Sequence, residues 1–455
     1  MIKKLFSFFL AACAASAVPA AGFDYSDGFF IVNEDWFGHQ NSTVNYILPE
    51  DADGEYWHYR VFQQENPGCE LGCTTQFGAI WNGRFYFISK QARDGGATVT
   101  GGRITVADAR TMKVVKQLEN IDPSGSQCDG RGFVGIDAAK GYVSSSNGIW
   151  VLDLNTVTVT GLVKGSSNPN TSDDKPVTDP SGSLYHGQCG SMVLSGSYVF
   201  AAHQSYGVLV IDTAKDEVIK VISTDAVQEG SGIGSVVLGN DGMVYGSIAG
   251  GTDGRGSSLP YLLHINPRSL DTSVISLPEG CYGPANSWYA WTPDGFFASE
   301  NENKLYWHGG PTSWFANQNI YCYDIGSDTC TMIIDLSKDP DNWQVYGCSI
   351  RMDPTTENIY MSVFHTFQDP TYVLRRYSNT GELLKEYPMV SNYWFPSLPV
   401  FPKSKTTGIE LPTADDTDAP AMLYDLQGRP SDRTTARPGV YIERRGTTAR
   451  KILIR

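Results

Sequence analysis

The chain has 455 residues, of which 41% are hydrophobic and 47 are glycine, and its formal net charge is -15 at pH 7. An acidic chain without a basic patch interleaved with aromatic residues is a poor partner for a phosphate backbone, so nucleic-acid binding is disfavoured. The length suffices for one large domain with small ends, and the glycine content suits many short strands and turns.

The first 21 residues have the pattern of an export signal. Lys3 and Lys4 precede an apolar run from Leu5 to Ala12, and small residues continue to Ala21. The run is too short to span a membrane as a mature helix. Cys13 lies in a segment that also matches a bacterial lipobox, so lipidation of Cys13 is the alternative to ordinary signal cleavage. We therefore expect an exported protein, either secreted or held at the cell surface.

Residues 22–402 contain a strand-turn-strand unit that recurs along the chain. Apolar runs meet tight polar turns such as Asn82-Gly83, as hairpins require. Five units close on similar lines: Ile104–Asp108, Ile149–Asp153, Val208–Asp212, Tyr261–Ile265 and Ile320–Asp324. The period of roughly 45 to 57 residues is that of a four-stranded propeller blade. The pattern predicts an all-β fold, a seven-bladed β-propeller.

The blade count depends on how the two ends of this region combine. Six full units begin near Phe77, Phe133, Gln188, Ile233, Trp288 and Tyr346. Three strands precede them, at Phe29–Val32, Val44–Ile47 and Tyr56–Phe62, and one strand, Ser397–Phe401, follows. We expect this last strand to be the innermost strand of the first blade, because such closure removes free sheet edges. The unit near Trp288 begins with either Trp288–Trp291 or Phe296–Ala298.

Eight cysteines follow Cys13, an even number that suits disulfides in an oxidising compartment. Cys322 and Cys330 flank Gly326 in a predicted hairpin, so we expect them to pair. Cys69 and Cys73 could close a small loop, and a zinc site there is disfavoured because no second pair follows at finger-like spacing. Pairing among the others stays open: Cys128, Cys189, Cys281 and Cys348.

The C-terminal 53 residues form a separate piece, a polar linker at 403–421 and a β tail at 422–455. Met422–Arg429, Pro438–Ile442 and Lys451–Arg455 resemble the closing strands of C-terminal sorting domains of the type IX secretion system in Bacteroidetes. The earlier strands of such a domain are missing. The alternative is a short β-hairpin appendage.

The start of the propeller region also resembles a known family. Gly28–Glu34, Trp36–Gly38 and Asn41–Val44 are similar to the opening of YncE-like seven-bladed propellers exported by Bacteroidetes, with Asp35 where glycine is usual. Some of these capture cobalamin at the surface and hand it to an outer-membrane transporter. The resemblance implies a monomeric binding propeller on the outer face of a Gram-negative outer membrane, or secreted, without a resident cofactor. Its partners would be a small polar ligand or nutrient, such as cobalamin, and a transporter.

Propeller geometry places the binding residues at one end of the axis, where second strands end and first strands begin. The candidates at this end are Gln76, Lys90, Asp129, Arg131, Asn147, Gln188, His203, Trp288, His308, Tyr346 and His365. Amides, imidazoles and aromatic rings together suit a polar ligand. The alternative is that they are ordinary polar loop ends. The segment 165–185 would be a rim over them or a solvated loop. His203, His308 and His365 fall on separate blades, so no metal site is expected.

Signatures of an enzyme are sparse. The chain has neither a Gly-x-Ser-x-Gly elbow nor a phosphate-binding Gly-x-x-x-x-Gly-Lys loop. Two carboxylate pairs, Glu300 with Glu302 and Asp129 with Asp137, would suit a hydrolase or lyase acting on glycan or lactone. We expect a non-enzymatic binding protein, with such an enzyme or an adhesion or assembly scaffold as the alternatives.

Overall fold

The computed structural model describes residues 23–168, 187–229, 231–250, 257–284, 295–310, 316–404, 422–424, 430–431, 439–445 and 448–454. The predicted export signal and nearly all of the predicted linker lie outside these residues. Within them, one short α-helix, α1 (Val61–Glu65), and one 3-10 turn, Leu336–Lys338, interrupt an otherwise β structure. Neither approaches the length of a membrane-spanning helix.

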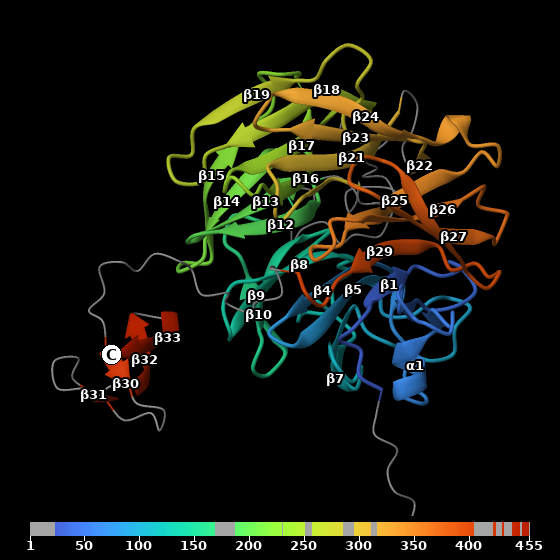
Figure 1. The fold of residues 1–455 in the computed structure, drawn as a ribbon, viewed down its shortest axis with the longest axis horizontal. Coiled ribbons are helices and arrows are strands. Elements are labelled where there is room, and N and C mark those ends of the chain that lie inside the picture. The colour runs from blue at the N-terminus through green and yellow to red at the C-terminus, as the bar shows by residue number, and fades with distance from the viewer. Residues whose placement is uncertain are drawn as a thin grey trace, which may run out of the picture.

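Seven antiparallel sheets surround one axis, so the predicted seven-bladed β-propeller is confirmed (Figure 1). In each blade the strands run in order from the axis outward. Blade 2 holds β4 (Cys73–Trp81), β5 (Arg84–Gln91), β6 (Ile104–Asp108) and β7 (Val114–Leu118). Blade 3 holds β8 (Gly130–Gly135), β9 (Lys140–Ser145), β10 (Gly148–Asp153) and β11 (Thr158–Leu162). Blade 4 holds β12 (Cys189–Ser195), β13 (Tyr198–His203), β14 (Gly207–Asp212) and β15 (Glu217–Ile222).

The remaining full blades follow the same order. Blade 5 holds β16 (Gly232–Leu238), β17 (Val244–Gly250), β18 (Ser257–Ile265) and β19 (Thr272–Ser276). Blade 6 holds β20 (Phe297–Ala298), β21 (Lys304–Gly309), β23 (Asn319–Asp324) and β24 (Thr329–Asp335). Blade 7 holds β25 (Gln344–Met352), β26 (Ile359–Phe364), β27 (Tyr372–Tyr377) and β28 (Leu383–Pro388), and β22 (Ala316–Asn317) pairs with β25. The first strand of blade 6 is thus the Phe296–Ala298 alternative, while Trp288–Trp291 lies outside the described residues.

Blade 1 is closed by both ends of the propeller region, as predicted. Its innermost strand is β29 (Pro396–Val400), followed outward by β1 (Phe29–Asn33), β2 (Thr43–Ile47) and β3 (Trp57–His58). The Ser397 hydroxyl donates to the carbonyl of Val32 at 3.1 Å and to that of Thr75 at 3.0 Å. This residue therefore ties the closing strand to blade 1 and to blade 2.

The outer strand of blade 1 is shorter than the predicted Tyr56–Phe62. It ends after His58, and α1 follows a left-handed Arg60 with φ 54°. Consecutive residues of a strand point to opposite faces, whereas Val61 and Phe62 are both buried in the same core cluster. A helical turn achieves this burial, which explains why the apolar pattern was misleading.

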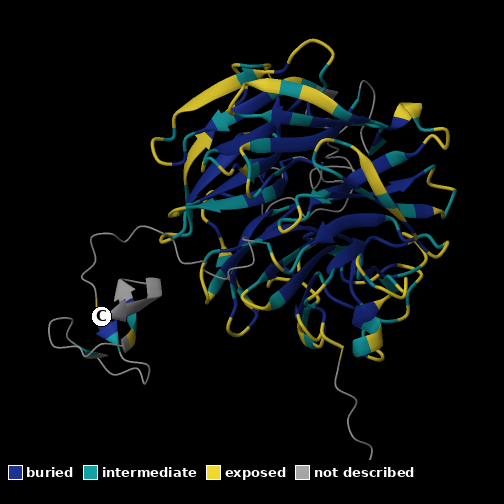
Figure 2. Ribbon diagram, viewed as in Figure 1, coloured by how far each residue is buried: buried dark blue, intermediate teal, exposed yellow. Residues whose placement is uncertain are grey.

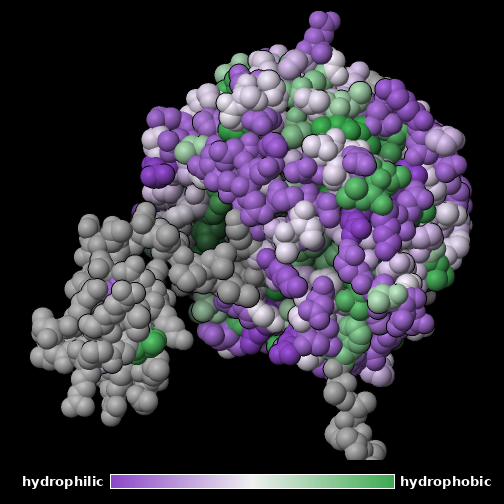
Figure 3. Space-filling model, viewed as in Figure 1, coloured by the Kyte–Doolittle hydropathy of each residue, from purple (hydrophilic) through white to green (hydrophobic). Residues whose placement is uncertain are grey.

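The core lies in the wedges between neighbouring blades. Phe30 on β1 packs against Phe85 of blade 2, with ring centroids 5.1 Å apart, while Phe29 packs against Tyr360 of blade 7 at 4.6 Å. Burial therefore alternates between two faces that are both covered, and exposure concentrates in the outermost strands and loops (Figure 2). The surface in view is mainly hydrophilic, with scattered apolar patches (Figure 3).

The C-terminal residues form the predicted small β appendage. Its sheet has the order β31 (Pro430–Ser431), β30 (Met422–Tyr424), β32 (Gly439–Arg445) and β33 (Thr448–Ile454). The hairpin of β32 and β33 pairs over seven residue positions, from Gly439 with Ile454 to Arg445 with Thr448. Leu423 is buried on this sheet.

Candidate functional site

Two of the predicted site residues lie at β-bulges in the innermost strands of blades 2 and 3. The register of β4 with β5 shifts between Thr75 and Phe77, and that of β8 with β9 shifts between Gly130 and Gly132. Gln76 and Arg131 are the residues skipped by these β-bulges. A bulge turns a side chain out of the regular alternation. Because innermost strands of adjacent blades contact one another, both side chains are brought to the axis.

These residues belong to a buried polar group that we call the axial cluster, consisting of Glu34, Gln76, Lys90, Asp129, Arg131 and Gln188. The Gln76 amide donates to Glu34 Oε1 at 2.5 Å. The Arg131 guanidinium donates to Gln188 Oε1 through Nε at 3.0 Å and through a terminal nitrogen at 2.6 Å, and it lies 3.7 Å from the Asp129 carboxylate. Arg131 and Gln188 are fully buried. Five predicted site residues therefore meet at one place.

The electrostatics of the axial cluster show competition between burial and pairing. Burial raises the pKa of Glu34, and this is opposed by the Lys90 charge and by hydrogen bonds from Gln76 and Tyr346. Burial lowers the pKa of Lys90, and this is opposed by the Glu34 and Asp129 carboxylates. Charged groups removed from water are costly unless they are paired. The charges of the cluster are therefore held in the interior by pairing with one another.

Two residues were missing from the predicted set: Glu34 of the axial cluster and Gln204 beside it. Glu34 directly follows β1, which is the second strand of blade 1, so it occupies the position that the strand-end rule selects in other blades. Applying the rule to the closing blade would have found it. Gln204 follows β13, and its amide oxygen lies 3.3 Å from the Gln188 backbone nitrogen. Gln204 directly follows the candidate His203, so the strand-end rule reaches it as well.

Four predicted residues lie at the same strand ends but have structural contacts of their own. Asn147 Oδ1 accepts hydrogen bonds from Trp150 and Cys128, each at 2.9 Å. His203 Nδ1 accepts from the backbone of Ser205 and Tyr206 at 3.1 and 3.0 Å. The other two are the histidines of blades 6 and 7. Of the last two candidates, Tyr346 is buried on β25 and hydrogen-bonds to Glu34, while Trp288 lies outside the described residues.

The two later histidines are held by neighbours in blades 6 and 7. His308 Nε2 lies 2.5 Å from the Gly347 carbonyl oxygen, and Asn317 Nδ2 lies 3.0 Å from His308 Nδ1. His365 stacks on Trp343 at 3.6 Å and contacts Asp369 at 2.9 Å. Within the residues that the structure describes, no His, Cys, Asp and Glu side chains form a group of three suited to a metal ion.

The expected Cys322–Cys330 disulfide is not formed. The register pairs Cys322 with Thr331 and Cys330 with Tyr323, so the two cysteines are offset by one residue. Successive side chains on a strand point to opposite faces, which separates the thiols. Every described cysteine is a free thiol in the structure, and the Cys73 thiol contacts Asp94 at 3.3 Å rather than Cys69.

The predicted pair of Asp129 and Asp137 does not have the separation of a glycosidase pair. Asp129 precedes β8 and Asp137 follows it, so they lie at opposite ends of one strand, roughly 25 Å apart at the rise of a strand. A catalytic pair requires a separation of roughly 5 to 9.5 Å. Glu302 forms an ion pair with Lys304 at 2.7 Å, and Glu300 accepts a hydrogen bond from Ser404.

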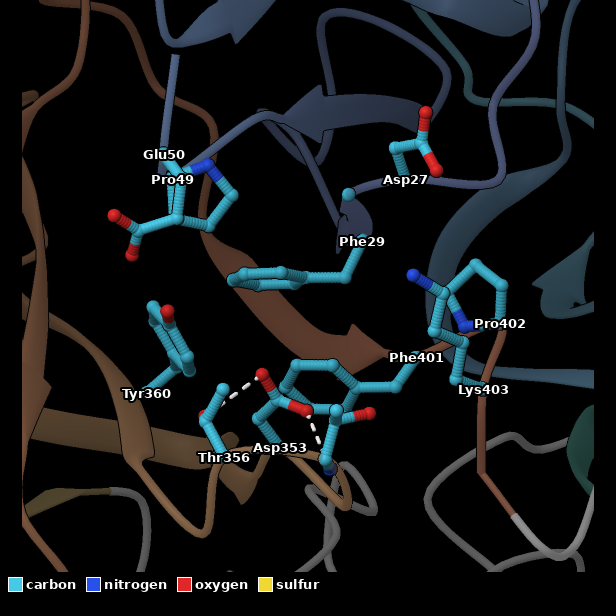
Figure 4. A pocket seen from close by; sticks show the side chains of 12 residues that line it. Asp27, Phe29, Pro49, Glu50, Asp353, Thr356, Tyr360, Phe401, Pro402 and Lys403 are labelled. Carbon is cyan, nitrogen blue, oxygen red and sulfur yellow. Dashed lines mark hydrogen bonds between the residues drawn. The ribbon is translucent and has the colours of Figure 1, made fainter. Parts of the chain in front are cut away.

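A shallow pocket of about 150 Å³ lies at the opposite end of the strands, at the seam between blades 1 and 7. The rings of Phe29, Tyr360 and Phe401 lie at its centre, with the carboxylates of Asp27 and Glu50 at its edge (Figure 4). Asp353, also at the edge, is engaged with Thr355 and Thr356. The pocket therefore does not overlap the predicted site.

The chain is similar to a solved structure and to a protein family. A chain in the crystal structure of the mitotic checkpoint complex is 12% identical, with 72% of this chain and 83% of that chain covered and a TM-score of 0.44. No curated protein matches the sequence. Residues 27–402 match the family described as a domain of unknown function, DUF5074. The match spans nearly the whole propeller, so the chain belongs to the DUF5074 family.

Proposed function

We propose that this propeller binds a small polar ligand at the axial cluster without transforming it. The observation that carries the proposal is the uneven chemistry of equivalent bulges. Blades 2 and 3 place Gln76 and Arg131 at these positions, whereas blade 4 has Gly190-Ser191 and blade 5 has Gly234-Ser235. The fold therefore tolerates small residues there, and buried charge on one side of the axis has no structural necessity.

The composition of the axial cluster indicates the class of ligand. Arg131 and Lys90 supply cations, Glu34 and Asp129 supply carboxylates, and Gln76 and Gln188 supply amides. A ligand that carries both donors and acceptors, such as an amide-rich or zwitterionic nutrient, matches this set better than a purely anionic or apolar one. Tyr346, which hydrogen-bonds to Glu34, adds an aromatic face.

The test is a thermal-shift panel of amino acids, glycan fragments and corrinoids, followed by calorimetric titration of every compound that raises the melting temperature. Gln76→Leu and Lys90→Met should weaken binding about tenfold to a hundredfold, because each removes a hydrogen bond or charge partner. Ser235→Ala, at the matching bulge of blade 5, is the control and should keep wild-type affinity. A ligand that binds both cluster variants unchanged, or a panel with no responding compound, would contradict the proposal.

The resemblance of Gly28–Glu34 to exported propellers supports a more specific proposal for the ligand, the partner and the location. We propose cobalamin as the first corrinoid to test, an outer-membrane transporter as the partner and the outer cell surface as the location. Surface proteolysis of intact cells tests the location, and the mass of the mature N-terminus decides between a lipidated Cys13 and cleavage near Ala21. An unprocessed protein in the cytoplasm would contradict export.

A further inference from the structure

Cys281 and Cys330 lie against each other although 49 residues separate them in sequence. Cys330 is on β24, and its register opposite Tyr323 turns it toward the core cluster between blades 5 and 6. Cys281 belongs to the segment that leaves blade 5 and packs on the same cluster. Its Sγ lies 4.0 Å from the Cys330 carbonyl oxygen.

The position of Cys281 is set by a tight turn. Its backbone N–H donates to the Pro278 carbonyl at 3.0 Å, and Gly280 between them has φ 86°, a conformation that favours glycine. The turn brings the thiol of Cys281 toward β24. Burial raises the pKa of the Cys330 thiol, and hydrogen bonding to the neighbouring Cys281 thiol raises it further.

Other buried thiols have different neighbours. Cys128 donates to Asn147 Oδ1 at 2.9 Å, Cys189 contacts the Ser166 carbonyl at 3.8 Å, and Cys348 contacts the Ser397 carbonyl at 2.8 Å. Cys322 packs into the core cluster on the other face of blade 6. Cys281 and Cys330 are both half-buried, so a small reagent can reach them.

We propose that Cys281 and Cys330 form the disulfide of this propeller when it meets an oxidising disulfide compound. The thiolate of one cysteine attacks the oxidant, giving a mixed disulfide, and the second thiolate displaces the remaining thiol. One sulfur–sulfur bond breaks in the oxidant and one forms in the protein. The two cysteines lose two electrons and two protons, and the oxidant leaves as two thiols. Formation of the bond in cells rests on the proposed export.

The bond links the segment after β19 to the outermost strand of blade 6. It closes a loop of about 50 residues, a length at which a disulfide strongly restricts the unfolded chain. Oxidation should therefore raise the melting temperature by about 5 °C. It would strengthen the attachment of blade 6 to blade 5 without touching the axial cluster.

The experiment treats the purified full chain with glutathione disulfide and maps the linked peptides without reduction. A protease that cleaves at aspartate is needed, because Asp324 and Asp328 separate Cys322 from Cys330, whereas trypsin leaves both in one peptide. We expect a Cys281–Cys330 link in the wild type and in Cys322→Ser. Cys281→Ser should lose both the link and the gain in melting temperature.

Two results would overturn the proposal. One is a Cys322–Cys330 link as the main product. The other is the lack of any Cys281–Cys330 link in a Cys322→Ser protein whose circular dichroism shows the native β fold. Ligand binding at the axial cluster is measured separately on the reduced protein, so failure of the disulfide and failure of the proposed function are distinguishable.

Discussion

His308 is a buried base held neutral by its surroundings. Burial lowers the pKa of His308 to about 4, with the nearby Arg351 charge also disfavouring the cation and the hydrogen bond to Gly347 acting in the opposite sense. Above pH 6.5 the imidazole is neutral in both folded and unfolded chains. Between pH 6.5 and 4 only the unfolded chain binds the proton, so the unfolding free energy falls on acidification.

This linkage predicts the acid sensitivity of the fold. The loss from His308 should reach about 1.4 kcal/mol per pH unit within that window. His308→Gln should lower the melting temperature at pH 7 but make it less dependent on pH between 6.5 and 4.5. His203, whose pKa burial also lowers to about 4, retains part of the dependence. Calorimetry at several pH values checks this, with the exposed His39→Gln as control. An unchanged slope in His308→Gln would contradict it.

Asp35 shows how the fold accommodates a departure from the family pattern. Asp35 stands where the resembling family has glycine, and its backbone is left-handed with φ 57°. Aspartate is among the residues that tolerate this region, and its carboxylate gains hydrogen bonds from Thr43 and Gln40.

Polar residues at strand ends were predictable from the repeat. Their division into the axial cluster and histidines with local partners was not, because it depends on contacts between distant blades.

Inter-blade packing at β8 gives a test at the scale of an element. A Cβ added to Gly135 would lie 2.0 Å from the ring of Trp81 on the innermost strand of blade 2. The Trp81 indole donates to the Asp137 carbonyl at 2.9 Å, which resists its displacement. Gly135→Ala should therefore destabilise the protein by about 1–3 kcal/mol. Gly161→Ala on β11, where a Cβ meets nothing within 4 Å, is the matched control. Equal melting temperatures for the two variants would contradict this packing.

Elements that are specified by local sequence signals were predicted well, whereas features that depend on a partner strand were not. Strands flanked by tight turns were found because period-two burial and turn residues are local signals. Bulges at Gln76 and Arg131 depend on how partner strands align, which no single strand reveals. The Cys322–Cys330 error has the same origin. The pairing of Asp324 with Thr329 leaves a turn of four residues between the two strands. A register with a three-residue turn would have placed Cys322 opposite Cys330.

At the scale of the whole molecule, closure of the ring was predictable from an incomplete count. Three strands at one end and one at the other add up to a blade, and free sheet edges are a liability for a β protein. The identity of the ligand that we propose was not predictable, because the repeat identifies one end of the axis and does not specify a ligand. The class of ligand that we propose rests on buried side chains that four different blades bring together in the axial cluster.

Closure also predicts how the chain responds to shortening. A chain of residues 23–404 lacks the tail but retains β29, whereas a chain of residues 23–395 lacks both. All five residues of β29 are buried, and Ser397 bonds blades 1 and 2. The loss of Leu398 and Val400 alone removes about 3–6 kcal/mol of apolar burial. We expect residues 23–404 to be monomeric with the melting temperature of the full chain. Residues 23–395 should aggregate or melt well below it, because β1 becomes a bare inner edge. Size-exclusion chromatography and calorimetry compare them, and equal stability would show that the ring does not depend on its closing strand.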